Sequence, residues 1–262
     1  MIIIDKNKRN ILLFIAAIPL LYSIQGHAYQ SPEGIMVAVS NPQTKDIKAD
    51  DDFTVDDEDE IKVNDPFESF NRAIFKFNDE LYTGVMKPIA IGYRAVIPEK
   101  ARSSIKNFFT NLLAPVRVVN AALQLKGQDA TNELVRFGVN TIIGFAGLLD
   151  VARDDFNIKI KKEDFGQTLG HYGMGSGPYL VLPLWGPSSV RDGFGLLVDG
   201  VYLDPVAYLD KTEDYLIVRF IDIETTISLD KDTYEAIKKD SLDPYIFIRN
   251  AYTQQRTGAV NK

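Results

Sequence analysis

The sequence contains no cysteine, and among its 262 residues only two are histidine and one is tryptophan. The absence of cysteine excludes disulfide bonds, thiolate ligands for metals, a cysteine nucleophile and a lipid attached through a thiol. Because only His27 and His171 could supply imidazole, we expect no multi-histidine metal centre, and we expect no cofactor. Few routes to metal-assisted or covalent catalysis are left.

Positive charge is also scarce, since 29 basic residues stand against 36 acidic ones and the net charge is -7. A general nucleic-acid-binding protein would more often be basic, so this composition disfavours nucleic acid as a partner. Hydrophobic residues make up 45% of the chain and charged residues 25%, which is typical of a globular protein. The length suits one domain, and the sequence shows no internal repeat.

The apolar stretch near the N-terminus, residues 11–24, is shorter than the roughly 20 residues that span a bilayer. A weakly basic segment precedes it, and Gly26 and Ala28 place small residues at the end of the stretch, where a signal peptidase would cut. This order is typical of a secretory signal peptide over residues 1–28. The alternative is an uncleaved membrane anchor, which Pro19 disfavours.

Residues 29–63 have the composition of a disordered linker, because they show little apolar periodicity. Nine acidic residues and one lysine lie between Asp46 and Glu60, so this acidic segment has a charge of -8 and the rest of the chain is nearly neutral. We interpret the segment as a solvated spacer. A docking tail for a basic partner is the alternative.

The folded region is predicted to begin with a helix at Pro66. Asp65 suits the N-cap position, Pro66 the first helical position and Glu68 the capping box. Apolar residues then recur at helical spacing, namely Phe67, Phe70, Ile74, Phe77 and Leu81. The same periodicity continues downstream, so the domain is predicted to be mainly α-helical.

Later helix boundaries are marked by proline and aspartate. A second helix is predicted to end before Pro115, and a third to follow it as far as Gly127. Asp129 is predicted to cap a fourth helix. Two further helix starts are predicted at Asp204-Pro205 and at Asp243-Pro244.

Two asparagines interrupt the apolar side of the first helix. Asn71 and Asn78 lie within the arc formed by Ile74, Phe75 and Tyr82. Since a buried amide without partners costs about 1–3 kcal/mol, each asparagine either bonds the backbone of a loop or borders a surface that is partly apolar and partly wet. In the second case the helix borders a path for an amphiphile, and replacing Asn71 by leucine would disturb lipid flow more than stability.

Two apolar segments downstream are too short to span a membrane. Residues 142–149 are apolar on all sides, so they form either a buried core element or an interfacial one. Residues 178–187 combine an apolar run with prolines that exclude a central strand or a helix interior. This run either packs against protein or dips into lipid, and we predict that Leu182, Leu184 and Trp185 lie at a membrane interface.

No group of residues forms a recognisable active site. Ser176 and Ser188 are the hydroxyls nearest to His171 in the sequence, but Met174 and Pro178 stand where a hydrolase elbow needs glycine. We interpret His171 as a structural residue that holds loop carbonyls. The protein is therefore predicted not to be an enzyme, and a lipid esterase that uses His171 is the alternative.

Two blocks of the sequence are long and specific enough to indicate a family. They are Asn64-Asp65-Pro66-Phe67-Glu68-Ser69-Phe70-Asn71-Arg72 and the run from Asp164 through Gly170-His171-Tyr172-Gly173 to Pro183. Both blocks resemble the MlaA/VacJ family of outer-membrane phospholipid-transport proteins. Arg191-Asp192 and Asp243-Pro244-Tyr245 extend the resemblance, which covers residues 64–256. Residues 257–262 are expected to form a flexible tail.

The resemblance implies a single ring-shaped helical domain with an amphipathic central channel. It implies a place at the periplasmic face of the outer membrane of a Gram-negative bacterium, beside a porin trimer. Phospholipid would leave the outer leaflet through the channel and pass to a soluble periplasmic carrier, which preserves lipid asymmetry. A structural porin-associated protein that moves no lipid is the alternative.

The lipid path is assigned to the first helix and to the glycine-bearing segment, where glycine lets backbone or lipid approach closely. The path residues are Phe67, Phe70, Asn71, Ile74, Phe75, Asn78, Gly144, Phe145 and Gly147. The residues assigned to structure are Asp65, Pro66, Gly170, His171, Tyr172 and Gly173. Family members are commonly anchored through an N-terminal cysteine, so we expect this chain to rely on its apolar belt and on the porin instead.

Overall fold

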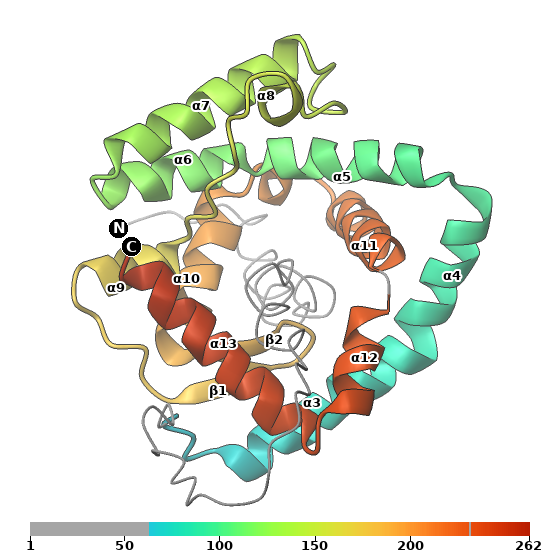
Figure 1. Ribbon diagram of the computed structural model, residues 1–262, viewed down its shortest axis with the longest axis vertical. Coiled ribbons are helices and arrows are strands. Elements are labelled where there is room, and N and C mark those ends of the chain that lie inside the picture. Colours follow the sequence, from blue (N-terminus) through green and yellow to red (C-terminus); the bar gives the residue numbers. More distant parts are fainter. Residues whose placement is uncertain (1–62, 231) are drawn as a thin grey trace, which may run out of the picture.

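The computed structural model describes residues 63–230 and 232–262, and Figure 1 shows their helices following one another around a ring. The predicted signal peptide and all but the last residue of the predicted acidic linker lie outside the described residues. Helices dominate the described chain, which confirms the predicted mainly α-helical domain. Within residues 63–230 and 232–262, no helix has the combination of length and apolar character that a membrane span requires.

The first arc of the ring is one continuous helical stretch that changes its winding once. α3 (Glu68–Leu81) passes into a π-helical turn, η1 (Tyr82–Met86), and then into α4 (Lys87–Val96). Pro88 has no N–H to donate to the carbonyl four residues before it, and the π-helical turn lies at that position. Pro98 separates α4 from α5 (Glu99–Leu112).

The next part of the ring is formed by α5 and α6 (Ala114–Leu123). α5 ends at Leu112, before Pro115, as predicted, but α6 ends at Leu123, so the prediction that the third helix reaches Gly127 is wrong. α7 (Gly127–Ile142) packs along α6 on the outer side of the ring and leads to the short helix α8 (Val151–Asp154). The prediction that Asp129 caps this helix is wrong, because α7 already begins at Gly127. The Asp129 carboxylate lies 3.6 Å from the ammonium of Lys161 instead.

A short β-hairpin lies between two helices of the next arc. α9 (Phe165–His171) precedes the antiparallel strands β1 (Tyr179–Leu182) and β2 (Gly186–Ser189), and α10 (Val190–Val198) follows them. Both strands are edge strands because the sheet has only these two within the described chain. An edge position tolerates Pro187, in agreement with the exclusion of a central strand.

The last arc contains a π-helical turn, a 3-10 helical turn and three α-helices. The elements in order are η2 (Asp199–Leu203), η3 (Pro205–Tyr208), α11 (Thr212–Leu229), α12 (Thr233–Asp240) and α13 (Pro244–Val260). Asp204 caps η3 and Asp243 caps α13, which confirms both predicted helix starts. α13 extends to Val260, so the predicted tail begins too early. Val260 packs beside Gly170, where the lack of a side chain leaves room for it.

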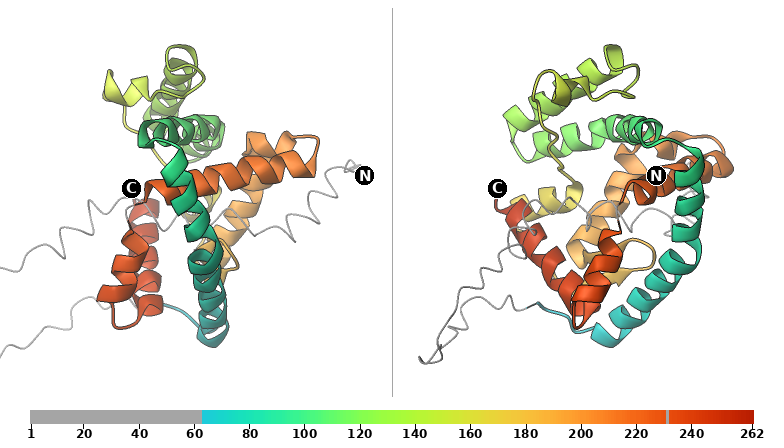
Figure 2. Two further views of the ribbon diagram at one scale, coloured as in Figure 1. Left: turned by 90° about the vertical axis from the view of Figure 1, so that its right-hand side faces the viewer. Right: turned by 45° about the vertical axis from the view of Figure 1, so that its right-hand side comes forward.

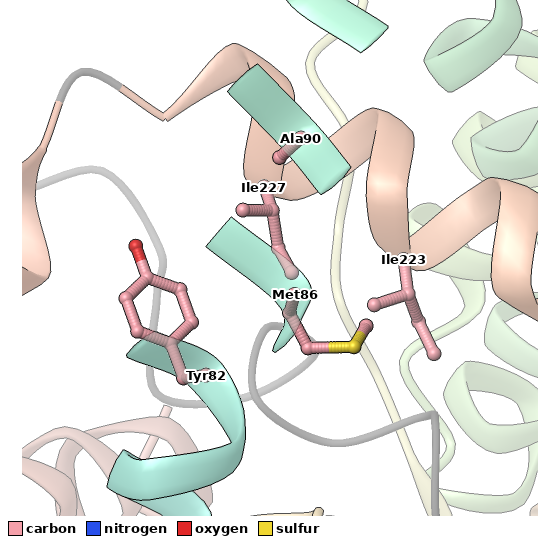
Figure 3. Close-up of a cluster of buried hydrophobic side chains, with 5 residues drawn as sticks. All are labelled: Tyr82, Met86, Ala90, Ile223 and Ile227. Atoms are coloured by element: carbon pink, nitrogen blue, oxygen red, sulfur yellow. The ribbon is translucent and has the colours of Figure 1, made fainter. Parts of the chain in front are cut away.

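α11 crosses the plane of the ring, as the side view in Figure 2 shows. A small apolar core fixes it there, in which Met86 and Ala90 lie against Ile223 and Ile227 of α11 with Tyr82 beside them (Figure 3). A second apolar cluster joins the hairpin to α3 and α13 and consists of Tyr179, Val181, Tyr245 and Tyr252. The apolar cores are small, so polar contacts must hold much of the ring together.

Candidate functional site

Many large apolar side chains of the ring are exposed. The large apolar side chains exposed between residues 67 and 156 are Phe67, Phe70, Phe77, Val85, Ile89, Ile91, Val96, Val119, Leu123, Leu125, Leu134, Val135, Ile142, Ile143, Phe145, Leu148, Leu149 and Phe156. Monomeric proteins in water rarely expose large contiguous apolar patches, and such patches mark contact with a membrane or a partner. The surface therefore suits an apolar environment.

Residues 142–149 form an exposed turn, with Ile142 and Phe145 at 82% and 71% exposure, which favours the interfacial interpretation over the buried one. The turn depends on Gly144 and Gly147, because other protein atoms lie where their side chains would be. A Cβ on Gly144 would lie 2.3 Å from the carbonyl oxygen of Leu149, and one on Gly147 would lie 2.4 Å from the Cβ of Asn111. These glycines thus admit protein atoms, while a role in the lipid path stays a prediction.

Asn71 is fully buried and binds the backbone of the hairpin. Its amide nitrogen donates to the carbonyl oxygen of Tyr179 at 3.0 Å and to Asp65 at 2.8 Å, and its oxygen accepts the N–H of Val181 at 2.8 Å. This is the first of the two interpretations of the sequence. Because both the nitrogen and the oxygen of the Asn71 amide are hydrogen-bonded to protein, any lipid path would have to run along the exposed side of α3.

Asn78 repeats this pattern at the turn of the hairpin. It donates to the carbonyl oxygen of Leu182 at 3.0 Å and accepts the N–H of Leu184 at 2.6 Å. The second bond draws the turn onto α3, and Leu184 is only 2% exposed. The prediction that Leu184 lies at a membrane interface is therefore wrong. Leu182 and Trp185 are half-buried, and their contact with a membrane stays a prediction.

The remaining path residues divide between two sides of α3. Phe67 and Phe70 are 49% and 58% exposed, whereas Ile74 and Phe75 pack against the second apolar cluster. Periodicity correctly identified a helix with apolar residues. The side of α3 that faces the protein, however, is the side that carries Asn71 and Asn78. A lipid path along the exposed phenylalanines stays a prediction.

Replacing Asn71 by leucine is expected to lower the free energy of unfolding by about 2 kcal/mol, because the hairpin backbone loses two buried partners. Thermal unfolding in detergent measures the effect. Lys76→Leu is the control, since it adds the same side chain at an exposed position of the same helix. Unchanged stability together with raised phospholipid in the outer leaflet would instead favour the lipid-path role.

Asp65 closes the ring rather than capping the first helix. α3 begins at Glu68 without a side-chain cap, and Pro66 lies in the turn before it, so the predicted capping box is wrong. Asp65 instead accepts hydrogen bonds from the hydroxyl of Tyr245 and from Arg249 of α13, the latter at 3.2 Å. We call these three residues the ring seam, because they join the first and last elements.

An ion cluster of five buried or half-buried residues fastens α9, α10 and α13 together. We call it the α13 ion cluster, and its members are Asp164, Arg191, Asp192, Tyr252 and Arg256. Arg256 donates to Asp164 and to Asp192, with shortest distances of 2.7 Å to each. Burial alone would raise the pKa of Asp192, but the bonds from Arg256, Arg191 and Tyr252 lower it to about 2.

The central sequence block leaves room for this cluster. A Cβ on Gly166 would lie 2.6 Å from the Asp192 carboxylate and 2.7 Å from the Arg256 guanidinium. A Cβ on Gly170 would lie 2.8 Å from the side chain of Val260. Gly173, with φ of +86°, follows the end of α9. The glycines of the block therefore serve packing and helix termination, as the assignment of Gly170 and Gly173 to structure expects.

His171 and Tyr172 are both exposed at the end of α9. The Tyr172 hydroxyl donates to the carbonyl oxygen of Leu123 at 2.6 Å, while the His171 ring contacts Tyr172 edge-on. Within the described residues, the His171 imidazole makes no hydrogen bond. The interpretation that His171 holds loop carbonyls is therefore wrong, since the neighbouring tyrosine does so.

A second buried network lies between α6, α7 and α8. Arg117 donates to Glu133 at 2.7 Å, and Arg136 donates to Asp150 at 2.9 Å. Asn140 also donates to Asp150, at 2.9 Å. The sequence analysis missed these residues because each stands among ordinary helical residues and finds its partner only in the folded chain.

Glu224 is a further residue that the sequence analysis missed. It lies on α11, is 3% exposed, and neither oxygen of its carboxylate accepts a hydrogen bond from a described residue. Burial raises its pKa to about 7. No local pattern marks Glu224, because α11 mixes polar and apolar residues on all sides.

Comparison with known proteins agrees with this fold. The family described as "MlaA lipoprotein" matches residues 63–259. The "Intermembrane phospholipid transport system lipoprotein MlaA" of Escherichia coli is 37% identical over 204 residues, which cover 76% of this chain and 79% of that one. An uncharacterized protein of Rickettsia bellii is 35% identical over 205 residues, covering 76% and 78% of the two chains.

One solved structure matches over most of the described chain. It is described as "Structural basis for maintenance of bacterial outer membrane lipid asymmetry", is 35% identical, and has a TM-score of 0.64. The match covers 75% of this chain and 99% of that one. Sequence and fold agree, and this chain therefore belongs to the MlaA lipoprotein family.

Proposed function

We propose that this protein transports phospholipids and so maintains the lipid asymmetry of a bacterial outer membrane. Relatives from Escherichia coli and Haemophilus influenzae carry the name of an intermembrane phospholipid transport lipoprotein. The observation that supports the proposal most is the exposure of large apolar side chains around the ring. A protein with such a surface is suited to lie in lipid rather than in water.

The same surface supports a position at the periplasmic face of the outer membrane. A ring that lies within one leaflet needs apolar surface but no membrane-spanning helix. Ile142 and Phe145, the most exposed side chains of the turn, would enter the acyl-chain region. Phospholipid would pass through the middle of the ring along the exposed face of α3, from the outer leaflet towards a soluble periplasmic carrier. The porin trimer expected from the family resemblance would hold the ring in place.

This function involves no covalent chemistry. Ser176 and Ser188 each donate a hydrogen bond to a carbonyl oxygen of the next residue, at 3.4 and 3.3 Å, rather than to His171. A lipid esterase would instead require that hydrolysis disappear in a His171→Ala variant. Exposure of His171 and its lack of a serine partner in the described chain disfavour that alternative.

The experiment is mass spectrometry of lipids and proteins that stay with the full chain after extraction from outer membranes in mild detergent. We expect bound phospholipid together with porin chains. A porin-associated scaffold would copurify with porin and hold no phospholipid, and that result would contradict the proposal. Lysophospholipid or free fatty acid that depends on His171 would favour the esterase.

A further inference from the structure

A polar recess lies between α5, α6, α7 and α8, which pack together at the top of the ring in Figure 1. It contains about 230 Å³ of space between atoms, which includes open solvent, and about 10 Å³ in which the centre of a water-sized group can lie. This is about the room that one water molecule or one oxygen of a ligand needs. The residues that line the recess are all polar, namely Asn107, Thr110, Asn111, Arg117, Arg136, Asn140 and Asp150. The recess therefore suits a small polar group.

Both arginines of the recess have an unused hydrogen-bond donor. Arg117 donates through Nε to Glu133 at 2.7 Å and through Nη1 to the carbonyl oxygen of Thr110 at 3.0 Å, but its Nη2 makes no hydrogen bond within the described residues. Arg136 donates through Nη2 to Asp150 at 2.9 Å. The buried Nε of Arg136 has no hydrogen-bond partner in the described chain and lies 3.9 Å from Glu133. Since Arg117 and Arg136 are only 9% and 3% exposed, water satisfies these donors poorly.

The recess lies at the base of the exposed apolar turn formed by residues 142–149. Asn140 and Asp150, which both line the recess, flank this turn in the sequence. Asn107 of α5 donates to the carbonyl oxygen of Leu148 in the turn at 3.4 Å. The proposed function places the apolar side chains of the turn among acyl chains. The polar recess at its base would then lie at the depth of the lipid headgroups.

We propose that the recess binds one unesterified oxygen of a phosphate group, which a phospholipid headgroup beside the turn supplies. Guanidinium N–H groups form strong, charge-assisted hydrogen bonds with phosphate oxygens. The Nε of Arg136 and the Nη2 of Arg117 would donate to this oxygen, while the rest of the headgroup stays outside, beside the half-buried Asn107. Because both arginines are already paired with carboxylates, binding depends on the unused donors rather than on net charge. The inference rests on the proposed function, since the lipid around the turn brings the phosphate.

The absence of cysteine from the chain permits a test that reports on the recess alone. In an Asn107→Cys variant the only thiol lies at the recess, and its rate of reaction with a small thiosulfonate reagent is measured in mild detergent. A short-chain phosphatidylglycerol at about ten times its Kd should slow this reaction roughly ten-fold, because only the unoccupied recess reacts. Thr131→Cys is the control, since Thr131 is exposed on α7 and does not line the recess. Its thiol should react equally fast with and without the lipid.

A second pair of variants changes the recess without touching its arginines. In the Asn107→Cys chain, Thr110→Leu should abolish the slowing by phosphatidylglycerol, because the larger side chain occupies the space of the ligand oxygen. Thr131→Leu makes the same replacement outside the recess and should leave the slowing unchanged. Thermal unfolding of both chains checks that they are folded.

The outcomes separate this inference from the proposed function. Equal reaction rates of Asn107→Cys with and without phosphatidylglycerol would overturn the inference, while phospholipid retained by the extracted wild type would still support transport. Absence of phospholipid from the wild type would contradict the proposed function itself. A diacylglycerol with the same acyl chains should not slow the reaction, and slowing as strong as that by the phospholipid would show that acyl chains cover the thiol and overturn the inference. Inorganic phosphate should act more weakly than the lipid, and equal potency would show a general anion site and overturn the lipid assignment.

Discussion

Replacing Arg256 by methionine is expected to lower the free energy of unfolding by about 3–5 kcal/mol, the cost of leaving buried charges unpaired. Arg256 donates to both Asp164 and Asp192 of the α13 ion cluster. Without it, two carboxylates lie in a poorly hydrated site with Arg191 as the remaining arginine of the cluster. Denaturant unfolding in detergent at pH 7 measures the change.

The matched control is Arg153→Met. Arg153 is 56% exposed and pairs with Asp154, which is 59% exposed, at 2.8 Å, while its contact with the buried Asp150 is longer, at 3.8 Å. An exposed ion pair of this kind contributes only about 0–1 kcal/mol, so the control should unfold nearly as the wild type does. A loss below about 1 kcal/mol in Arg256→Met would show that water or a nearby group replaces the guanidinium, contrary to the prediction.

The same cluster predicts how acid affects the wild type. The pKa of Asp192 is lowered to about 2 in the folded chain, from 3.8. Folding therefore favours the ionised form, and this contribution is present above pH 4 and is lost as the pH falls towards 2. In Arg256→Met the bond that does most to lower this pKa is gone. The acid limb of its stability profile should accordingly be flatter.

Replacing Glu224 by glutamine is expected to raise the free energy of unfolding by about 3 kcal/mol at pH 8, with little change at pH 4. Burial raises the pKa of Glu224 to about 7 from 4.5. Folding therefore favours the protonated acid, so its contribution is fully present below pH 4.5 and is lost as the pH rises through 7. Glutamine keeps the shape and cannot ionise.

Unfolding at a series of pH values between 4 and 8.5 tests this prediction. Glu213→Gln is the control, because Glu213 is an exposed residue in the first turn of the same helix, α11. Its profile should follow the wild type. Parallel profiles of Glu224→Gln and the wild type would mean that Glu224 finds a partner or water when ionised, and the prediction would be wrong.

Helix boundaries could be predicted wherever the signal lies within a few residues. Pro115 and the Asp243-Pro244 pair act on their own turns, so their effects follow from local geometry. The residues around Asp65 favour a helix cap just as strongly. In the folded chain, however, the Asp65 carboxylate accepts a hydrogen bond from Tyr245, which lies 180 residues later. A local pattern cannot show such competition.

The candidate site shows the same limit. Asn71 left two interpretations open because its partners, Tyr179 and Val181, lie 108 and 110 residues away. Periodicity likewise identified an apolar side of α3 without indicating which side meets the protein. Phe70 turned out to be exposed and Asn71 buried, the reverse of the ordinary distribution in a water-soluble protein.

The ring seam has a consequence for the order in which the chain acquires its structure. Asp65 and Arg249 are 184 residues apart, so their contact cannot form until almost the whole chain has been synthesised. Contacts of such long separation slow folding, because the entropy of closing the loop is lost before the contact forms. We therefore expect the helices synthesised first to form an open arc whose apolar faces are uncovered. We expect the nascent chain to depend on chaperones until α13 has been synthesised.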